Sequence, residues 1–470
     1  IWAASFYGAA TSGYTYGISG PLHYGLWGAL MILFIYPFGR RFRELAPNAH
    51  TLGELIHARH GSSSQLILAS SNILGSIISL MVNFTASGAL VSVLSPLSFQ
   101  TGVIVAGVGV LSYTLWSGFR ASVLTDFAQL MAMMAVAILI IPAVLFSLGG
   151  PQTLADGMSL LTPEQANLFS MDAILNQGAP FFVAVLAYAI GNQTISQRLY
   201  GAIVIGLGMI GLMALMTGME PIDGDMNNLI PQMVSMYLSP VFIGMFFILV
   251  IGSLSSTADS DLSAMSAIVM ADVYGKNIAK NKPDPTKMLF IGRLTMIVAT
   301  LIGVILASFS MDILILLVFV GALWGAIVFP VIASCFWDRV TNAAFTSSVI
   351  TGLVMFCVAR FELLPMVSVI PVLFELLAAV GGGVVLGLMA FGFCGRRVGL
   401  IIGALGAIGL AIFCVGFLRD YTVLLASLMA YGVSTIVCVV VSLLSSSKFD
   451  FSQIDQQVIN YDPVKTAVQA

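Results

Sequence analysis

Charge is what this sequence has least of. Only 8% of its 470 residues are Asp, Glu, Lys or Arg, whereas a soluble domain carries roughly a quarter. Hydrophobic residues make up 59% of the chain, and its mean hydropathy is +1.02. This composition indicates a polytopic membrane protein. The net charge of −3 offers no basic surface to a polyanion, so we expect no nucleic-acid partner.

Paired cysteines and common catalytic motifs are also missing. The five cysteines lie in or beside apolar runs and none forms a CxxC pair, which argues against a disulfide framework and a zinc site. The sequence has no HExxH, no GxSxG beside a histidine and no GxGD pairing of aspartates. We therefore expect neither an enzyme nor a resident cofactor.

Long apolar runs dominate instead. With about 20 residues needed for each crossing of a bilayer, the sequence predicts fourteen helices. They lie at 1–19, 23–38, 63–94, 101–117, 122–148, 179–200, 202–217, 239–274, 288–308, 311–335, 343–360, 366–394, 397–417 and 421–446. If the first helix runs outward, all of the 18 Lys and Arg residues except Arg360 and Arg419 lie inside. This bias predicts a multi-pass protein of the plasma membrane, or of the inner membrane in a bacterium, with a cytoplasmic C-terminus.

Two features concern the continuity of the chain. The sequence opens at Ile1 within an apolar segment, and SQRLYG runs directly into AIVIG without residues for a chain reversal. We expect that segments before Ile1 and near Gly201 are missing. In the loop before the third helix, Thr51 and Glu54 have the spacing of a capping box, which predicts a helix start there.

Interruptions in the helices indicate an internal repeat. The third helix in each of two sets of five, 63–94 and 239–274, is long and carries a polar stripe. The first helix of each set is broken by glycine and polar residues, in YGAATSGYTYGISG and AIGNQTISQR. Paired interruptions mark the central site of many transporters. The predicted divisions are a first repeat at 1–148, an external loop at 149–178, a second repeat at 179–335, additional C-terminal helices at 343–446 and a cytoplasmic tail at 447–470.

The stretch SLSSTADSDLSAMS places Asp259 and Asp261 inside a membrane helix. A charge at the bilayer centre costs about 2.5–3.5 kcal/mol, so both carboxylates imply a partner. Polar side chains share one face of this helix: Ser256, Asp259, Ser260 and Ser263. Thr257 and Asp261 lie beside that face, and Asp126 adds an acid in the fifth helix. Such oxygens suit a small hard cation such as sodium. The alternative is that the hydroxyls bond to their own helix and the aspartates face a cytoplasmic vestibule.

Other polar and aromatic side chains are candidate solute contacts. They are Ser5, Tyr24, Trp27, Tyr188, Asn192, Gln193 and Trp324. Tyr24 and Trp27 open the second helix, where they suit an interfacial aromatic belt as well as a pocket wall. Tyr188, Asn192 and Gln193 suit a pocket and a packing role equally, and Trp324 also suits the core. Glu375 lies beyond the ten-helix core and suggests a structural or oligomer contact.

Several segments of the chain resemble the sodium:solute symporter family. They are TLGELIHARHG, GFRASVLTDFAQ, NQTISQR, SSTADSDLSAMSAIVMADVY and FPVIASCFWDRVTNAAF. WAAS, YTYGISGP and RELAPNAHT are most similar to its urea/polyamine-transporter branch. The resemblance implies an all-α polytopic fold. Its core is a LeuT-type 5+5 inverted repeat with alternating access, followed by additional C-terminal transmembrane helices.

The resemblance also implies ion sites. One sodium ion would bind Ser256, Thr257 and a backbone carbonyl of Ile1, and some members hold a second at positions matching Asp126, Ser256, Asp259 and Ser260. Asp259 stands where the family has a hydroxyl. Its carboxylate either strengthens the cation site or carries a proton, so H⁺ is the alternative coupling ion. Tyr188 matches an aromatic gate of sugar-transporting members and departs from the urea branch.

These features together predict a sodium-coupled symporter that imports a small polar organic solute, with urea or a related nitrogen compound favoured. Its expected partners are that solute, sodium and the lipid bilayer. The alternatives are symport of an amino acid, a sugar, sialic acid or a carboxylate, a transporter-like solute sensor, and a channel.

Overall fold

The computed structural model describes residues 3–49, 51–191, 200–279, 284–365, 367 and 369–459. These residues form helices and turns, and none of them lies in a β-strand. The predicted all-α fold is therefore confirmed.

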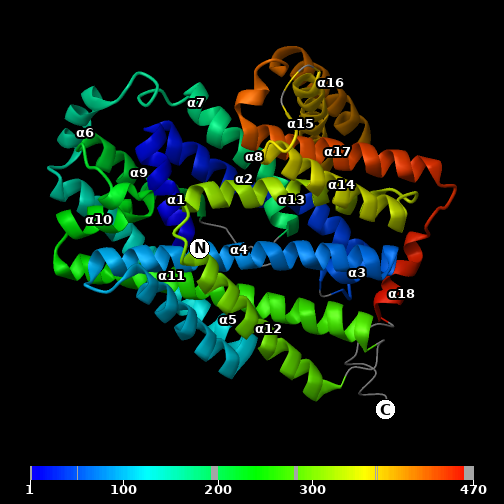
Figure 1. The fold of residues 1–470 in the computed structure, drawn as a ribbon, viewed down its shortest axis with the longest axis horizontal. Helices are drawn as coiled ribbons and strands as arrows, with labels where there is room; N and C mark the ends of the chain where they lie inside the picture. The colour runs from blue at the N-terminus through cyan, green and yellow to red at the C-terminus, as the bar shows by residue number, and fades with distance from the viewer. Residues whose placement is uncertain are drawn as a thin grey trace.

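The helices fall into three groups along the chain (Figure 1). The first group comprises α1 (Ala3–Tyr16), α2 (Ser19–Leu45), α3 (Leu52–His60), α4 (Ser62–Leu94) and α5 (Phe99–Ser147). The second comprises α8 (Ala179–Gly191), α9 (Tyr200–Met216), α10 (Leu229–Tyr237), α11 (Pro240–Ala267), the π-helix η5 (Ile268–Ile278) that continues it, α12 (Pro285–Ala307) and α13 (Ile313–Phe336). The third comprises α14 (Asn342–Arg360), α15 (Ile370–Cys394), α16 (Arg396–Cys414), α17 (Thr422–Leu444) and α18 (Ile454–Ile459). The loop after α5 holds α6 (Pro151–Gly157), α7 (Met171–Ala173) and the π-helix η2 (Ile174–Gly178).

Within the described residues, nine helices are long and apolar enough to cross a membrane, or ten if a bent pair at 134–160 forms one span. This is fewer than the fourteen predicted. The described parts of α1, α8 and α9 are 14, 13 and 17 residues long, shorter than the ~20 residues of a full span.

The boundary predicted between 101–117 and 122–148 is wrong. One continuous helix of 49 residues, α5, covers both stretches. The segment between them has a glycine, Gly118, but no proline. A lone glycine weakens a helix by only about 1 kcal/mol and need not end it. At 1.5 Å per residue α5 is roughly 73 Å long, more than twice the ~30 Å hydrocarbon core of a bilayer.

The centre of the bundle is the crossing of α4 and α13. Trp324 of α13 is fully buried, and its indole N–H donates to the carbonyl of Ser71, 3.3 Å away. Its ring lies directly against Gly75, where a Cβ atom would come within 1.8 Å of the indole. The structure therefore places Trp324 in the packed core, and only a residue without a side chain at position 75 permits that crossing.

Replacing Gly75 with alanine should destabilise the fold by about 1–3 kcal/mol, the usual cost of forcing an extra methyl group into a packed core. The measurement is the midpoint of thermal unfolding of the detergent-solubilised protein. Gly244→Ala in α11 is the matched control, because no atom lies within 4 Å of the added Cβ. Equal midpoints for the two variants would contradict the tight crossing.

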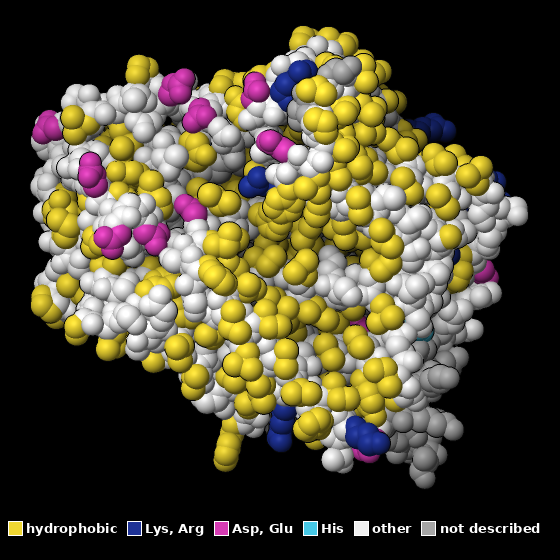
Figure 2. Space-filling model, in the orientation of Figure 1, with side chains coloured by type: hydrophobic (Ala, Val, Ile, Leu, Met, Phe, Trp, Pro, Cys, Tyr) yellow, Lys and Arg dark blue, Asp and Glu magenta, His cyan; other side chains and the backbone are white. Residues whose placement is uncertain are grey.

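Acidic side chains gather at one end of the molecule. Figure 1 places α6, α7 and α10 at the left and α3 and α18 at the right, with α4 and α11 running between the two ends. In Figure 2 the visible Asp and Glu side chains cluster over the left end. That end holds the two long loops, at 149–178 and 218–238, that the sequence predicts to be external.

The remaining sequence-based structural predictions concern single residues. Thr51 caps α3, its hydroxyl accepting from the Glu54 N–H at 3.2 Å, as the capping box predicts. Glu375 has the structural role suggested for it. Its buried carboxylate accepts from the backbone N–H groups of Gly416 and Arg419 and from the Arg419 guanidinium, at 2.8–3.1 Å. These bonds tie α15 to the turn that leads into α17.

Candidate functional site

The polar stretch of α11 stays helical because it contains neither proline nor glycine between Ser253 and Ala267. One of its hydroxyls is bonded within the helix. The Thr257 hydroxyl donates to the carbonyl of Ser253 at 3.1 Å, a bond that Ser and Thr commonly make inside helices. The expectation of bonding within the helix is thus confirmed for Thr257. A hydroxyl has two lone pairs, so its oxygen can still accept or bind a cation.

Asp259 is fully buried and faces α5. The Tyr113 hydroxyl lies 2.8 Å from Asp259 Oδ2 and 3.1 Å from the carbonyl of Ser255. The Ser260 hydroxyl donates to Asp259 Oδ1 at 3.4 Å. Tyr113 was not identified from the sequence, since nothing in YTLWSG marks which face of that helix meets α11.

Asp261 is also fully buried and faces α4. The Ser79 hydroxyl donates to Asp261 Oδ2 at 2.5 Å, and Asn83, one turn further along α4, donates to the carbonyl of Ser79 at 2.8 Å. The polar stripe predicted on 63–94 therefore points at the polar stretch of α11. The alternative in which Asp261 faces a cytoplasmic vestibule is wrong for this conformation.

The donor set fits an alkali cation better than a transition metal. The polar groups on this part of α11 are hydroxyl and carboxylate oxygens, which hard cations prefer. Among the described residues, no group of three or more His, Cys, Asp or Glu side chains could hold a metal ion. Ser256, Thr257, Asp259 and Ser260 occupy two consecutive turns of α11. Their oxygens suit the small hard cation expected from the sequence.

Aromatic candidates lie where α2 meets α8. Tyr24 is 3% exposed, and its ring packs edge-on against Phe181 with centroids 4.8 Å apart. Trp27 packs in the same way against Phe182, also at 4.8 Å. The Tyr24 hydroxyl would lie 3.1 Å from a Cβ at Gly8, so it rests on α1. The interfacial-belt interpretation is therefore wrong for Tyr24, which belongs to the packed junction of α1, α2 and α8.

The other candidates are partly outside the described structure. Ser5 is fully buried on α1. Ile1, Asn192 and Gln193 lie outside the described residues. Asp126 lies in α5 and Tyr188 in α8, and the side chains of both are outside the described part of the chain. Of the predicted solute contacts, Tyr24 therefore lies against α1, the helix that carries Ser5. Trp324 lies elsewhere, where α13 crosses α4.

A buried amide that sequence analysis missed fixes the break between α1 and α2. The Ser12 hydroxyl donates to Gln177 Oε1 at 2.8 Å, and Gln177 Nε2 donates to the carbonyl of Gly20 at 3.0 Å. A Cβ at Gly20 would meet the carbonyl of Ser12 at 2.1 Å, so glycine allows this close approach. The π-helix η2 therefore holds the interrupted first helix at the end predicted to be external.

Comparison with known proteins matches a model of the sodium:solute symporter family to residues 1–200 and 182–352. The chain belongs to this family. It is therefore a multi-pass membrane transporter and not an enzyme, and membership implies a solute carried together with sodium or protons.

Individual family members are distant in sequence. The sodium/pantothenate symporter of Escherichia coli (strain K12) is 25% identical over 387 residues, which cover 76% of this chain and 79% of the relative. The probable urea active transporter 1 of Schizosaccharomyces pombe (strain 972 / ATCC 24843) is 24% identical over 404 residues, 75% of this chain and 60% of the relative.

The fold is also similar to a solved structure, the substrate-bound outward-open state of a Na⁺-coupled sialic acid symporter. The TM-score is 0.59 and the identity 15%, and the match covers 87% of this chain and 89% of that one. This likeness bears out the predicted LeuT-type fold.

Proposed function

We propose that this symporter uses an inward sodium gradient to import a small polar organic solute across the plasma membrane, with its C-terminus in the cytoplasm. The observation that carries the proposal is the buried Asp259 on the hydroxyl-rich face of α11, bonded to Tyr113 of α5. A carboxylate is costly inside a membrane unless a partner compensates its charge, and a co-transported cation is such a partner.

Ion binding would couple to solute binding by favouring one conformer. A sodium ion at Ser256, Thr257 and Asp259, with Ser260 beside Asp259, would favour the conformer in which α11 packs against α5. Asp126 of α5 remains our proposed ligand for a second sodium ion. The solute would lie between the interrupted helices, near Ser5, Tyr24 and Trp27 on one side and Tyr188, Asn192 and Gln193 on the other. Symport requires only that both ligands prefer the same conformer.

For the solute, urea or a related small nitrogen compound is our first choice. The segments WAAS, YTYGISGP and RELAPNAHT support it, as does the similarity to a probable urea active transporter. The relative named as a sodium/pantothenate symporter favours a second candidate, a carboxylate-bearing solute.

Uptake of radiolabelled urea into proteoliposomes tests this proposal. An inward sodium gradient should drive accumulation above equilibrium, whereas an equal potassium gradient should not. Urea flux that equilibrates without regard to either ion would indicate a channel. If urea does not move, the solute assignment fails, and the same vesicles would be tested with pantothenate, proline and short carboxylates. A solute that binds but is never transported would favour a sensor.

A further inference from the structure

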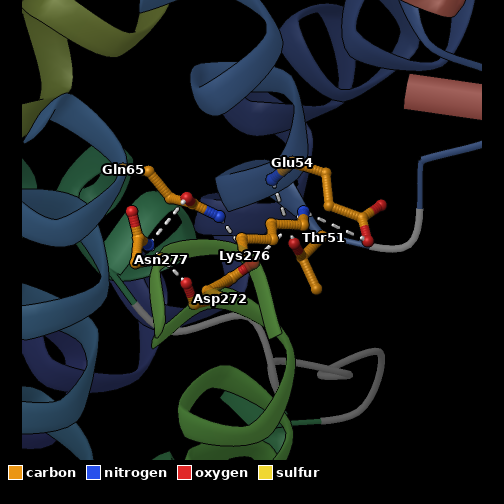
Figure 3. A network of polar contacts seen from close by, with 6 residues as sticks. All are labelled: Thr51, Glu54, Gln65, Asp272, Lys276 and Asn277. Carbon is orange, nitrogen blue, oxygen red and sulfur yellow. Dashed lines mark hydrogen bonds and ion pairs between the residues drawn. The ribbon is translucent and has the colours of Figure 1, made fainter. Parts of the chain in front are cut away.

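A second buried polar cluster, drawn in Figure 3, lies away from the proposed ion site. It lies at the end of the molecule that holds α3 (Figure 1), which is predicted to be cytoplasmic. Lys276 of η5 lies between two carboxylates, with its Nζ 3.6 Å from Glu54 Oε1 of α3 and 3.4 Å from Asp272 Oδ1. Gln65 of α4 donates to Asp272 Oδ1 at 2.7 Å, and Asn277 donates to the Asp272 carbonyl at 2.6 Å. We call Glu54, Gln65, Asp272 and Lys276 the α3–η5 cluster.

The three charged side chains of this cluster are more buried than charged side chains at the end of a helix usually are. The side chains of Lys276, Asp272 and Glu54 are 6%, 3% and 17% exposed. A lysine in the last turn of a helix with an acid four residues earlier is common and stabilises that helix alone. Here the lysine also reaches a different element. A Cβ at Gly53 would come within 2.7 Å of Asp272 Oδ2, so α3 and η5 approach each other closely at this point.

α3 is itself held on its opposite side. The Arg59 guanidinium donates to the carbonyls of Trp337 and Asp338 at 3.2 and 2.9 Å, and it stacks 4.1 Å above the ring of Phe449. His60 shares a 2.7 Å hydrogen bond with Ser334 of α13. Burial lowers the pKa of Arg59 to about 10, which leaves it charged at neutral pH. The α3–η5 cluster therefore fastens η5 to an anchored helix.

η5 is the direct continuation of the helix that carries the proposed ion site. Asp261 and Asp272 are 11 residues apart, or about 16 Å at 1.5 Å per residue. From Ile268 onward the helix is π-helical, a form that is rare and is often found at functional sites. α3 contacts η5 at this end of the helix, and any separation of the two would break the ion pair between Lys276 and Glu54.

We infer that Lys276 is a positioning residue of the transport cycle: ion-paired with Glu54 and Asp272, it holds the cytoplasmic end of α11 closed and so favours the conformer that binds sodium. The expected change in sodium affinity rests on the proposed function. The role of Lys276 in holding α3 against η5 rests only on the contacts described above. Removing Lys276 leaves two carboxylates buried without their ammonium, which disfavours the closed conformer strongly.

Hydrogen–deuterium exchange of the purified full-length protein, at graded NaCl with KCl keeping ionic strength constant, tests this inference. Lys276→Gln should exchange several-fold faster than wild type in peptides 52–60 and 262–279, while peptides of α15–α17 stay unchanged. In wild type, sodium should slow exchange in the peptide 253–266. In Lys276→Gln the sodium concentration that gives half of this protection should rise roughly tenfold, because the conformer that binds sodium is less populated. Lys276→Arg, which keeps the positive charge, should restore both properties.

Two further variants separate this role from general loss of packing. Glu54→Gln combined with Lys276→Gln should be milder than Lys276→Gln alone, since only one buried carboxylate then loses the neighbouring ammonium. Arg40→Gln is the matched control, because it breaks an exposed ion pair with Glu44 at the same end of the molecule and should change nothing.

Two results would overturn the inference. In one, Lys276→Gln exchanges like wild type over 262–279. In the other, the double variant is no milder than the single. Sodium that protects no wild-type peptide would instead refute the proposed sodium coupling, and the exchange rates would still decide whether the cluster closes this end.

Discussion

Replacing Ser256 and Thr257 together with alanine should abolish sodium-driven accumulation of the solute. Both hydroxyls lie on the polar turn of α11, and their oxygens are the proposed ligands of the coupling ion. Coupling free energies in such systems correspond to about 5–150-fold changes in affinity. We expect the half-saturating sodium concentration to rise by at least the upper part of that range. The measurement is initial uptake into proteoliposomes as a function of external sodium.

The matched control is Thr351→Ala in α14. The Thr351 hydroxyl donates to the carbonyl of Ser347 at 2.7 Å, just as Thr257 donates to Ser253. Both changes thus remove a hydroxyl bonded within its own helix, but only Thr257 faces the proposed site. Equal loss of transport in Thr351→Ala and in the double variant would mean that the effect is on helix stability and not on ion binding.

The second large effect is expected at Asp259. Asp259→Asn keeps the shape and the Tyr113 hydrogen bond but removes the negative charge that a cation would compensate. The half-saturating sodium concentration should rise about tenfold or more. Tyr113→Phe, which keeps the charge, should have a smaller effect in the same direction. The measurement is again uptake against sodium concentration.

Asp455→Asn is the control for Asp259, because this carboxylate accepts from Asn48 at an exposed position. A specific outcome would reverse the role we give Asp259. If Asp259→Asn kept the sodium dependence but lost stimulation by an inward proton gradient, the residue would carry a proton. Sodium would then bind without it.

The sequence was most informative where chemistry and periodicity coincide. Asp259 and Asp261 stand out because carboxylates are rare in apolar helices, and the structure places both in the buried interior of the bundle. The stripe on 63–94 was also evident from the sequence, and the structure shows that its Ser79 bonds Asp261. Glu375 and the cap at Thr51 followed from similar local reasoning.

The contacts that the sequence could not reveal are those between helices that lie far apart along the chain. Tyr113 and Gln177 are single polar residues in ordinary surroundings, and their partners lie 146 and 157 residues away. The continuity of α5 was missed because the sequence between its two apolar runs contains Gly118 and Arg120, neither of which forbids a helix. Lys276 reads as part of a lysine-rich loop. Its contact with Glu54, 222 residues earlier in the chain, exists only because α3 packs against η5.

Direct binding of ²²Na⁺ to the purified protein tests the central claim without any assumption about the solute. Wild type should bind sodium saturably, and unlabelled sodium should compete whereas potassium should not. Ser256→Ala/Thr257→Ala should lose that binding, while Thr351→Ala retains it. If the wild-type protein binds no sodium, or if the double variant binds as tightly as wild type, the coupling ion does not lie on this face of α11.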